Sequence, residues 1–200
     1  MKSRTHRMTC AVAAFVGAVA LTTLAGAEDR PVPDTYLAVT QHMTPADVEL
    51  KADVLRWSSE DERKAVIAAL QSEEDPAAAL SALPTVGVVW RSGSAVGHSI
   101  KYAQRADTAD GQRITLVTDK TIGATSFVPW KADNPVTDAT LDYSVVEMTV
   151  GDSDQGQGTM SLSAGVKVDA DAATVSLDPG GGAPLLKNVR HAPKPYWAKE

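Results

Sequence analysis

The stretch TMSLSAGVKV (residues 159–168) carries the clearest secondary-structure pattern in the 200-residue chain. Its apolar side chains, from Met160 to Val168, occupy every second position and alternate with small or polar residues. Successive side chains of a β-strand point to opposite faces, so this period of two indicates one buried face and one solvated face. The pattern therefore predicts a half-buried strand over residues 159–168.

Strand patterns continue on both sides of this stretch. Upstream, residues 143–150 predict a strand, which a loop over residues 151–158 joins to the first. Downstream, the turn residues Asp169-Ala170-Asp171 lead into a strand at residues 173–177. A flexible glycine-rich loop then precedes a last strand, Leu185–Arg190.

The middle of the chain predicts further short strands at hairpin spacing. Residues 86–91 form one strand, and a second runs through Ile100 and Tyr102. Turn residues at 107–111, including an Asp-Gly pair typical of tight hairpins, separate the second strand from a third that ends near Asp119. Short strands so closely connected indicate antiparallel pairing.

Residues 44–57 carry two competing patterns. Thr44 followed by Pro45 resembles the start of a helix, where proline is common at the first position. The apolar and charged side chains of residues 48–54 alternate with a period of two, as in a half-buried strand. We predict a strand, with a bulge or an end near Val54.

Two short helices are expected before the central strands. Ser59 followed three residues later by Glu62 forms a capping box, and Val66, Ile67 and Leu70 supply an apolar stripe, which predicts a helix over residues 60–71. Pro76 opens a second helix that extends to about residue 83.

These elements predict an α+β fold that is mainly antiparallel β: a single curled sheet, a sandwich or a partial barrel, with two short helices near its start. We find no repeat and no domain linker. We expect an extended lead-in at residues 28–45, a single β-rich domain at residues 46–190 and a proline-rich tail at residues 191–200.

The first 27 residues are typical of a secretory signal peptide. Lys2, Arg4 and Arg7 form a basic start, an apolar run follows, and Ala25-Gly26-Ala27 matches a signal-peptidase site. Cleavage after Ala27 would send the protein to the periplasm or outside the cell and would remove Cys10, the single cysteine. A secreted domain without disulfides favours a bacterial envelope.

Charge excludes several classes of partner. The chain has a net charge of −6, and removal of the basic leader would make it more acidic. An acidic surface repels nucleic acid and anionic membranes, so we expect no nucleic-acid binding. No second apolar run is long enough to cross a bilayer, so no membrane anchor is expected after cleavage. We expect a monomer.

The chain resembles a group of small secreted bacterial proteins that have no assigned activity. The resemblance spans most of residues 46–190 and implies a single β-rich domain but no catalytic residue. It rests on the stretches RWSSEDERKAVIAAL (56–70), LPTVGVVWRSGSAVGHSIKYAQR (83–105), RITLVTDKTIG (113–123), YSVVEMTV (143–150), GQGTMSLSAGVKVD (156–169) and LLKNVR (185–190).

A hydrolase site can be sketched around His98. The stretch Gly93–Gly97 lacks the spacing of a nucleophile elbow, but His98 follows it, and Asp119 or Glu147 could act as its acidic partner. Such a site requires His98 and the carboxylate to lie within about 4 Å of each other. A glycine-rich turn with an ordinary histidine is the competing interpretation.

Metal and cofactor motifs are absent from the sequence. The histidines show no spacing typical of zinc ligands. Residues 152–156 alternate carboxylates before a glycine, as calcium loops do, but Ser163 stands where an EF-hand requires glutamate. We therefore expect no cofactor and no metal, and interpret residues 152–156 as a hairpin loop.

We expect instead a non-enzymatic envelope protein that binds a small ligand or a protein partner. Loops on a β scaffold commonly carry binding residues, and the irregular segment 123–141 contains Trp130. Trp130, Tyr102 and His98 are the candidate ligand-binding residues. A hydrolase around His98 is the alternative function.

Overall fold

The computed structural model describes residues 33–72, 75–124, 126–135, 141–151, 156–178, 180 and 182–192. The expected signal peptide at residues 1–27, the loop at 152–155 and residues 193–200 of the expected tail lie outside the described residues.

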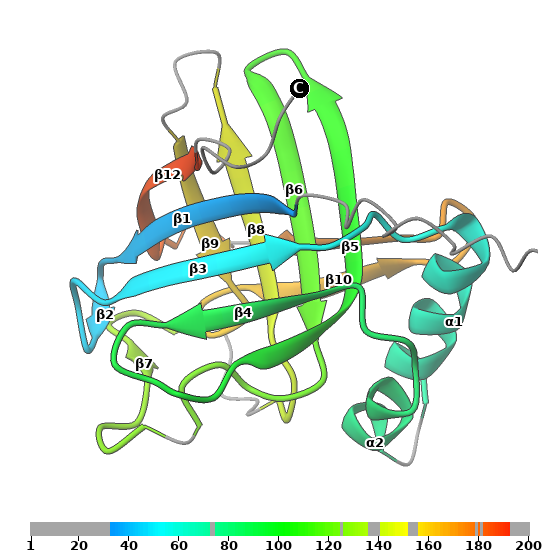
Figure 1. The fold of residues 1–200 in the computed structure, drawn as a ribbon, viewed down its shortest axis with the longest axis horizontal. Helices are drawn as coiled ribbons and strands as arrows, with labels where there is room; N and C mark the ends of the chain where they lie inside the picture. Colours follow the sequence, from blue (N-terminus) through cyan, green and yellow to red (C-terminus); the bar gives the residue numbers. More distant parts are fainter. Residues whose placement is uncertain are drawn as a thin grey trace, which may run out of the picture. The chain divides into compact units, whose positions relative to one another are not determined.

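Within the described residues, eight antiparallel strands form a closed barrel (Figure 1). Each barrel strand pairs with the next barrel strand along the chain, and the last pairs with the first, which is an up-and-down arrangement. The barrel strands are β1 (Asp34–Thr40), β3 (Glu49–Val54), β4 (Gly87–Arg91), β5 (His98–Thr108), β6 (Gly111–Thr118), β8 (Val145–Val150), β9 (Gly156–Met160) and β12 (Leu186–His191).

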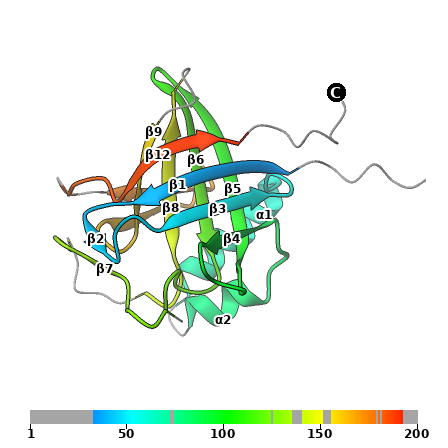
Figure 2. The ribbon, with the colours of Figure 1, turned by 60° about the vertical axis from the view of Figure 1, so that its left-hand side comes forward.

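Three insertions decorate the barrel. Helices α1 (Glu60–Leu70) and α2 (Pro76–Ser81) connect β3 to β4, and Figure 2 shows them beside the lower part of β5. The hairpin of β10 (Gly165–Asp169) and β11 (Thr174–Asp178) lies between β9 and β12 in the chain. The short strands β2 (Met43–Thr44) and β7 (Lys131–Ala132) pair with each other.

Two hydrophobic cores follow from the alternation of side chains across the barrel wall. Inward residues such as Ile114, Leu116 and Met148 fill the barrel. Outward residues such as Tyr102 and Val145 form a second core with α1, α2 and the β10–β11 hairpin. Burial of one such side chain contributes about 1.5–3 kcal/mol to folding, so both faces of this part of the wall stabilise the fold.

Both helices begin as their sequences predict. The Ser59 hydroxyl accepts a hydrogen bond from the amide of Glu62, and the Glu62 carboxylate accepts one from the amide of Ser59. The capping box therefore starts α1 at Glu60. Asp75 accepts a hydrogen bond from the amide of Ala78 at the start of α2, where Pro76 takes the first helical position.

The expected strand at 159–168 is wrong in its extent. The chain leaves the barrel after Met160, turns at residues 161–164 and continues as β10 in a different sheet. The apolar alternation survives because Met160 packs in the barrel core, whereas Ala164 and Val168 pack in the second core. A period of two shows which residues are buried but not in which core they lie.

Two further expectations are corrected at the ends of the domain. Residues 34–40, expected to belong to an extended lead-in, form the barrel strand β1. The expected curled sheet, sandwich or partial barrel is a closed barrel, because β1 pairs with both β3 and β12. The coarser prediction, mainly antiparallel β-structure with two short helices, is confirmed.

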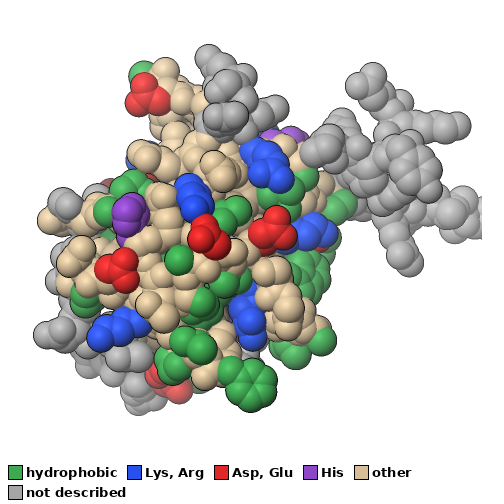
Figure 3. Space-filling model, turned by 90° about the vertical axis from the view of Figure 1, so that its left-hand side faces the viewer, with side chains coloured by type: hydrophobic (Ala, Val, Ile, Leu, Met, Phe, Trp, Pro, Cys, Tyr) green, Lys and Arg blue, Asp and Glu red, His purple; other side chains and the backbone are tan. Residues whose placement is uncertain are grey.

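At the end where β1 and β4 finish, the surface carries mixed side chains. Figure 3 shows charged side chains of both signs among hydrophobic ones on this face. No helix in the described part of the chain is long and apolar enough to cross a membrane.

Candidate functional site

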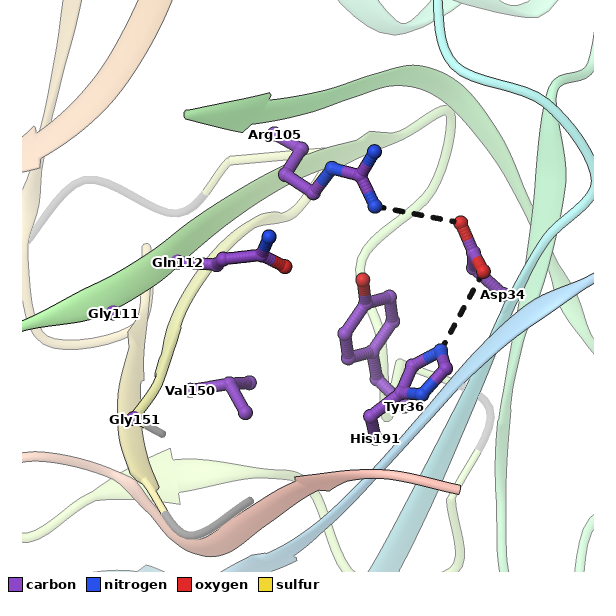
Figure 4. A pocket seen from close by; sticks show the side chains of 8 residues that line it. All are labelled: Asp34, Tyr36, Arg105, Gly111, Gln112, Val150, Gly151 and His191. Carbon is purple, nitrogen blue, oxygen red and sulfur yellow. Dashed lines mark ion pairs between the residues drawn. The ribbon is translucent and has the colours of Figure 1, made fainter. Parts of the chain in front are cut away.

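Polar side chains gather at one end of the barrel interior, where β1 begins and β5, β8 and β12 finish. They line a cavity of about 270 Å³, which we call the mouth. Below it, the interior is filled by the hydrophobic core. The mouth is lined by Asp34, Tyr36, Arg105, Gly111, Gln112, Val150, Gly151 and His191 (Figure 4).

Strand register places these side chains on the inner face. Residues directly opposite each other in an antiparallel pair point to the same side of the sheet. Asp34 lies opposite Val54, and Arg105 lies opposite Ile114; both apolar partners belong to the barrel core. The inward positions of the barrel therefore change from apolar to polar in the last layer before solvent.

Asp34 is the hub of the mouth. Its Oδ2 accepts a 3.1 Å hydrogen bond from Nε1 of Trp57, which follows β3 in the chain. Its Oδ1 lies 3.5 Å from Nε2 of His191. The Nη1 atom of Arg105 lies 3.9 Å from Oδ2, which is an ion pair but too long for a direct hydrogen bond.

Arg105 is held by aromatic neighbours. Its guanidinium lies over the Trp57 ring, 5.0 Å from the centroid, and it is close enough to Tyr36 to lower the pKa of that phenol. A stacked guanidinium keeps its in-plane N–H groups in a fixed direction, and such groups recognise carboxylates well. Figure 4 shows the guanidinium and the Tyr36 hydroxyl directed toward each other.

The Tyr36 hydroxyl is a hydrogen-bond donor at neutral pH. Burial raises its pKa above the usual value of 10.0, and the charge of Asp34 raises it further, while Arg105 acts in the opposite direction. His191 packs edge-on against the Tyr36 ring with the ring centroids 5.2 Å apart. The tyrosine is therefore fixed in a protonated state at the base of the mouth.

The lining residues combine hydrogen-bond donors and acceptors with one charge of each sign. The donors are Arg105 and the Tyr36 hydroxyl, and the carboxylate of Asp34 is the acceptor. The formal charges of Asp34 and Arg105 balance when His191 is neutral. The two charged groups are 3.9 Å apart and both line the cavity. The mouth therefore suits a small ligand with a hydrogen-bond acceptor for Arg105 next to a hydrogen-bond donor for Asp34.

The sequence-predicted ligand residues lie elsewhere, and none of them lines the mouth. Tyr102 is fully buried in the second core, where its hydroxyl accepts a hydrogen bond from the amide of Val175 at 3.4 Å and contacts Gln104. Burial raises its pKa. Trp130 is buried in the barrel core, and a Cβ atom on Gly123 would meet its ring at 2.2 Å.

His98 is also buried. It lies opposite the inward-facing Val89, at the other end of the barrel from the mouth. Burial lowers the pKa of its imidazole below the usual value of 6.5, so the neutral form is favoured. The three predicted residues therefore do not converge on one cavity.

The expected hydrolase arrangement around His98 does not form. Among the described residues, His98 has no carboxylate within the 4.0 Å of an ion pair, and Asp119 pairs instead with Lys101 at 3.7 Å. Glu147 accepts a hydrogen bond from the amide of Leu177 on the outer wall, opposite the face that carries His98. The separation contradicts the 4 Å requirement of that hypothesis.

The sequence did not single out any residue of the mouth. Asp34 and His191 come from the first and last strands of the barrel, and Arg105 and Gln112 come from the β5–β6 hairpin in the middle of the chain. The signal that could have found them is a polar residue at an inward position near a strand end, which requires the strand register. Within the described residues, no group of three or more metal-ligating side chains is placed to hold a metal ion.

Comparisons with protein-family models, with curated proteins and with solved structures found no match. The resemblance to small secreted bacterial proteins stays a prediction.

Proposed function

We propose that the protein is an exported, non-enzymatic binding protein of the bacterial envelope that holds a small polar ligand in the mouth. Export is supported by the basic start, apolar run and small-residue site in residues 1–27. The binding function is supported by the polar layer that ends an otherwise apolar barrel interior.

The main support for this proposal is the distance between the charged groups of Arg105 and Asp34. Their charged groups are 3.9 Å apart, so they attract each other without satisfying each other's hydrogen bonds. A ligand carboxylate would accept hydrogen bonds from Arg105 and the Tyr36 hydroxyl. A ligand ammonium would donate to Asp34. The ligand class is therefore a small zwitterion of the amino-acid type, with Gln112 adding a further polar contact.

The size of the mouth agrees with this class. A volume of about 270 Å³ corresponds to roughly nine water molecules at liquid density, and hence to a ligand with a similar number of non-hydrogen atoms. The purified protein without its leader can be titrated with L-alanine, propionate and ethylammonium. Propionate and ethylammonium each lack one charged group of alanine, so the three probes separate the two halves of the site.

We expect alanine to shift the NMR signals of the Arg105 side chain and of the Gly111 and Gly151 amides, which line the mouth. Propionate and ethylammonium should each bind at least about tenfold more weakly than alanine, because a charge-assisted hydrogen bond contributes about 1.5–3 kcal/mol. Arg105→Gln should abolish the alanine shifts. Arg113→Gln is the matched control, since Arg113 is an exposed arginine on the neighbouring strand β6.

Two results would contradict the proposal. One is equal binding of alanine and propionate, which would remove the role of Asp34. The other is unchanged alanine binding in Arg105→Gln. Export is tested separately by N-terminal sequencing of the protein from the envelope fraction of its host, where the chain should begin at Glu28.

A further inference from the structure

A second cavity lies on the outer face of the barrel wall, whereas the mouth opens on the inner face. It has a volume of about 400 Å³ and spans β12, β1, β3 and β4. We call it the outer groove and define it by the outward side chains of Leu37, Val39, Glu49, Lys51, Trp90 and Arg190.

Strand register arranges four of these residues in one row. Leu37 lies opposite Arg190 on one side and opposite Lys51 on the other, and Lys51 lies opposite Trp90. Opposite side chains on neighbouring strands are about 5 Å apart and share a face. Leu37 is therefore flanked by two cations, with the indole ring at the end of the row.

Val39 extends the apolar floor into the next row. It lies opposite Glu49 on β3, two residues along from Leu37. Leu37 and Val39 are half-buried, whereas their chain neighbours Tyr36 and Ala38 point into the barrel and are buried. The floor of the groove is thus an apolar strip on the outward face of β1.

Trp90 forms a fixed wall. Gly97, in the turn after β4, approaches the indole so closely that a Cβ atom there would lie 2.7 Å from Nε1 of Trp90. On the other side, Nζ of Lys51 lies 5.4 Å from the ring centroid. The indole is held between these two neighbours, so the groove is formed before any ligand arrives.

The central row is cationic on an acidic chain. The net charge of the chain is −6, but both charged members of this row, Arg190 and Lys51, are basic. Lys51 also bonds to Asp53 at 2.8 Å, and Arg190 has no ion pair within 4.0 Å among the described residues. The one lining carboxylate, Glu49, lies in the next row.

We propose that the outer groove binds a small amphipathic carboxylate, such as a short acyl or aromatic acid. The carboxylate lies above Leu37, between Arg190 and Lys51. The apolar body lies on Leu37 and Val39 against the indole of Trp90. Cavities of this size commonly hold small ligands through an apolar lining with few polar anchors. This site is independent of the proposed zwitterion site in the mouth.

The test uses octanoate, octanol and octylammonium as probes on the purified protein, followed by NMR titration of the backbone amides. Octanoate should shift signals of β1, β3 and β4 around the groove and should saturate. Octanol and octylammonium should bind at least about tenfold more weakly, because neither can accept charge-assisted hydrogen bonds from Arg190 and Lys51. The outer groove is disproved if all three probes bind alike or if none saturates.

Variants locate the binding. Arg190→Gln and Lys51→Gln should each weaken octanoate binding about tenfold, and Trp90→Ala should weaken it further. Arg113→Gln, on another part of the outer surface, should leave it unchanged. Arg105→Gln should also leave it unchanged, which separates this proposal from the mouth. Circular dichroism checks that each variant folds. Unaltered octanoate binding in folded Arg190→Gln and Lys51→Gln would overturn the assignment.

Discussion

The ammonium of Lys101 lies 3.7 Å from the carboxylate of Asp119, and the two side chains are only 6% and 12% exposed. The same ammonium donates to the backbone carbonyl of Leu83 at 2.8 Å and to that of Ser81 at 3.2 Å, at the end of α2. One buried lysine on β5 thus ties the helical insertion to the barrel wall.

Lys101→Met should lower the free energy of unfolding by about 3 kcal/mol, because it leaves a buried carboxylate and two carbonyl groups without their partner. Urea denaturation measures this change. The control is Lys64→Met, which removes an exposed ion pair with Glu60 and should change the free energy of unfolding far less, because solvent screens that pair. Equal effects of the two variants would show that Lys101 does not tie α2 to the wall.

Glu62 should make the stability of the fold depend on acid pH. Hydrogen bonds from Arg56 and from the Ser59 amide lower its pKa from 4.5 to about 2. The folded pKa is below the unfolded one, so this stabilisation is complete above about pH 4.5 and is lost as the pH falls through about 2. Urea denaturation should show that Glu62→Gln has a lower free energy of unfolding than wild type at pH 6, and that this difference shrinks by pH 2. A difference that stays constant with pH would contradict this.

His98 should weaken the fold at mildly acid pH. Burial lowers its pKa below 6.5, so the unfolded chain binds a proton more readily than the folded one. The contribution of the neutral imidazole is complete above pH 6.5 and is lost as the pH falls below that value. His98→Gln should therefore flatten the decrease in melting temperature between pH 7 and pH 5, measured against wild type. If the melting temperature of His98→Gln falls with pH as steeply as that of wild type, His98 is not the source of this decrease.

Gly97→Ala should disturb the wall of the outer groove. The added Cβ would lie 2.4 Å from Cγ1 of Val88 and 2.7 Å from Nε1 of Trp90, so the turn or the indole must move. Overpacking of this kind costs about 1–3 kcal/mol. We expect a lower melting temperature and weaker octanoate binding. Gly165→Ala is the comparison, because a Cβ atom there would come no closer than 4.0 Å to another atom, and Gly165 does not line the groove; it should leave octanoate binding unchanged.

Local signals in the sequence predicted the helices and most strands. The capping box at Ser59 and the proline at position 76 act within one turn of the chain, so they are visible without tertiary information. Strand β1 was not recognised because its outward residues, Leu37 and Val39, are as apolar as its inward ones. The same departure from alternation produces the floor of the outer groove.

The mouth could not be predicted because it depends on pairing between distant strands. Tyr36 meets His191 only through the β1–β12 ladder, and Arg105 reaches Asp34 only across the barrel end. Conversely, Tyr102 and Trp130 were predicted to bind a ligand, Trp130 because it lies in an irregular segment, but both side chains pack in the two cores. Burial, rather than residue type, decided which candidates face a cavity.

The ladder between β1 and β12 also sets the order in which this protein can assemble. Until β12 arrives, β1 lacks one neighbour and exposes an unpaired strand edge, which is a template for aggregation. Pairing between strands so distant in sequence is intrinsically slow. During synthesis or translocation from the N-terminus, β1 therefore keeps an unpaired edge until residue 191 is available to pair with it. The barrel can close only after synthesis or translocation of β12 is complete.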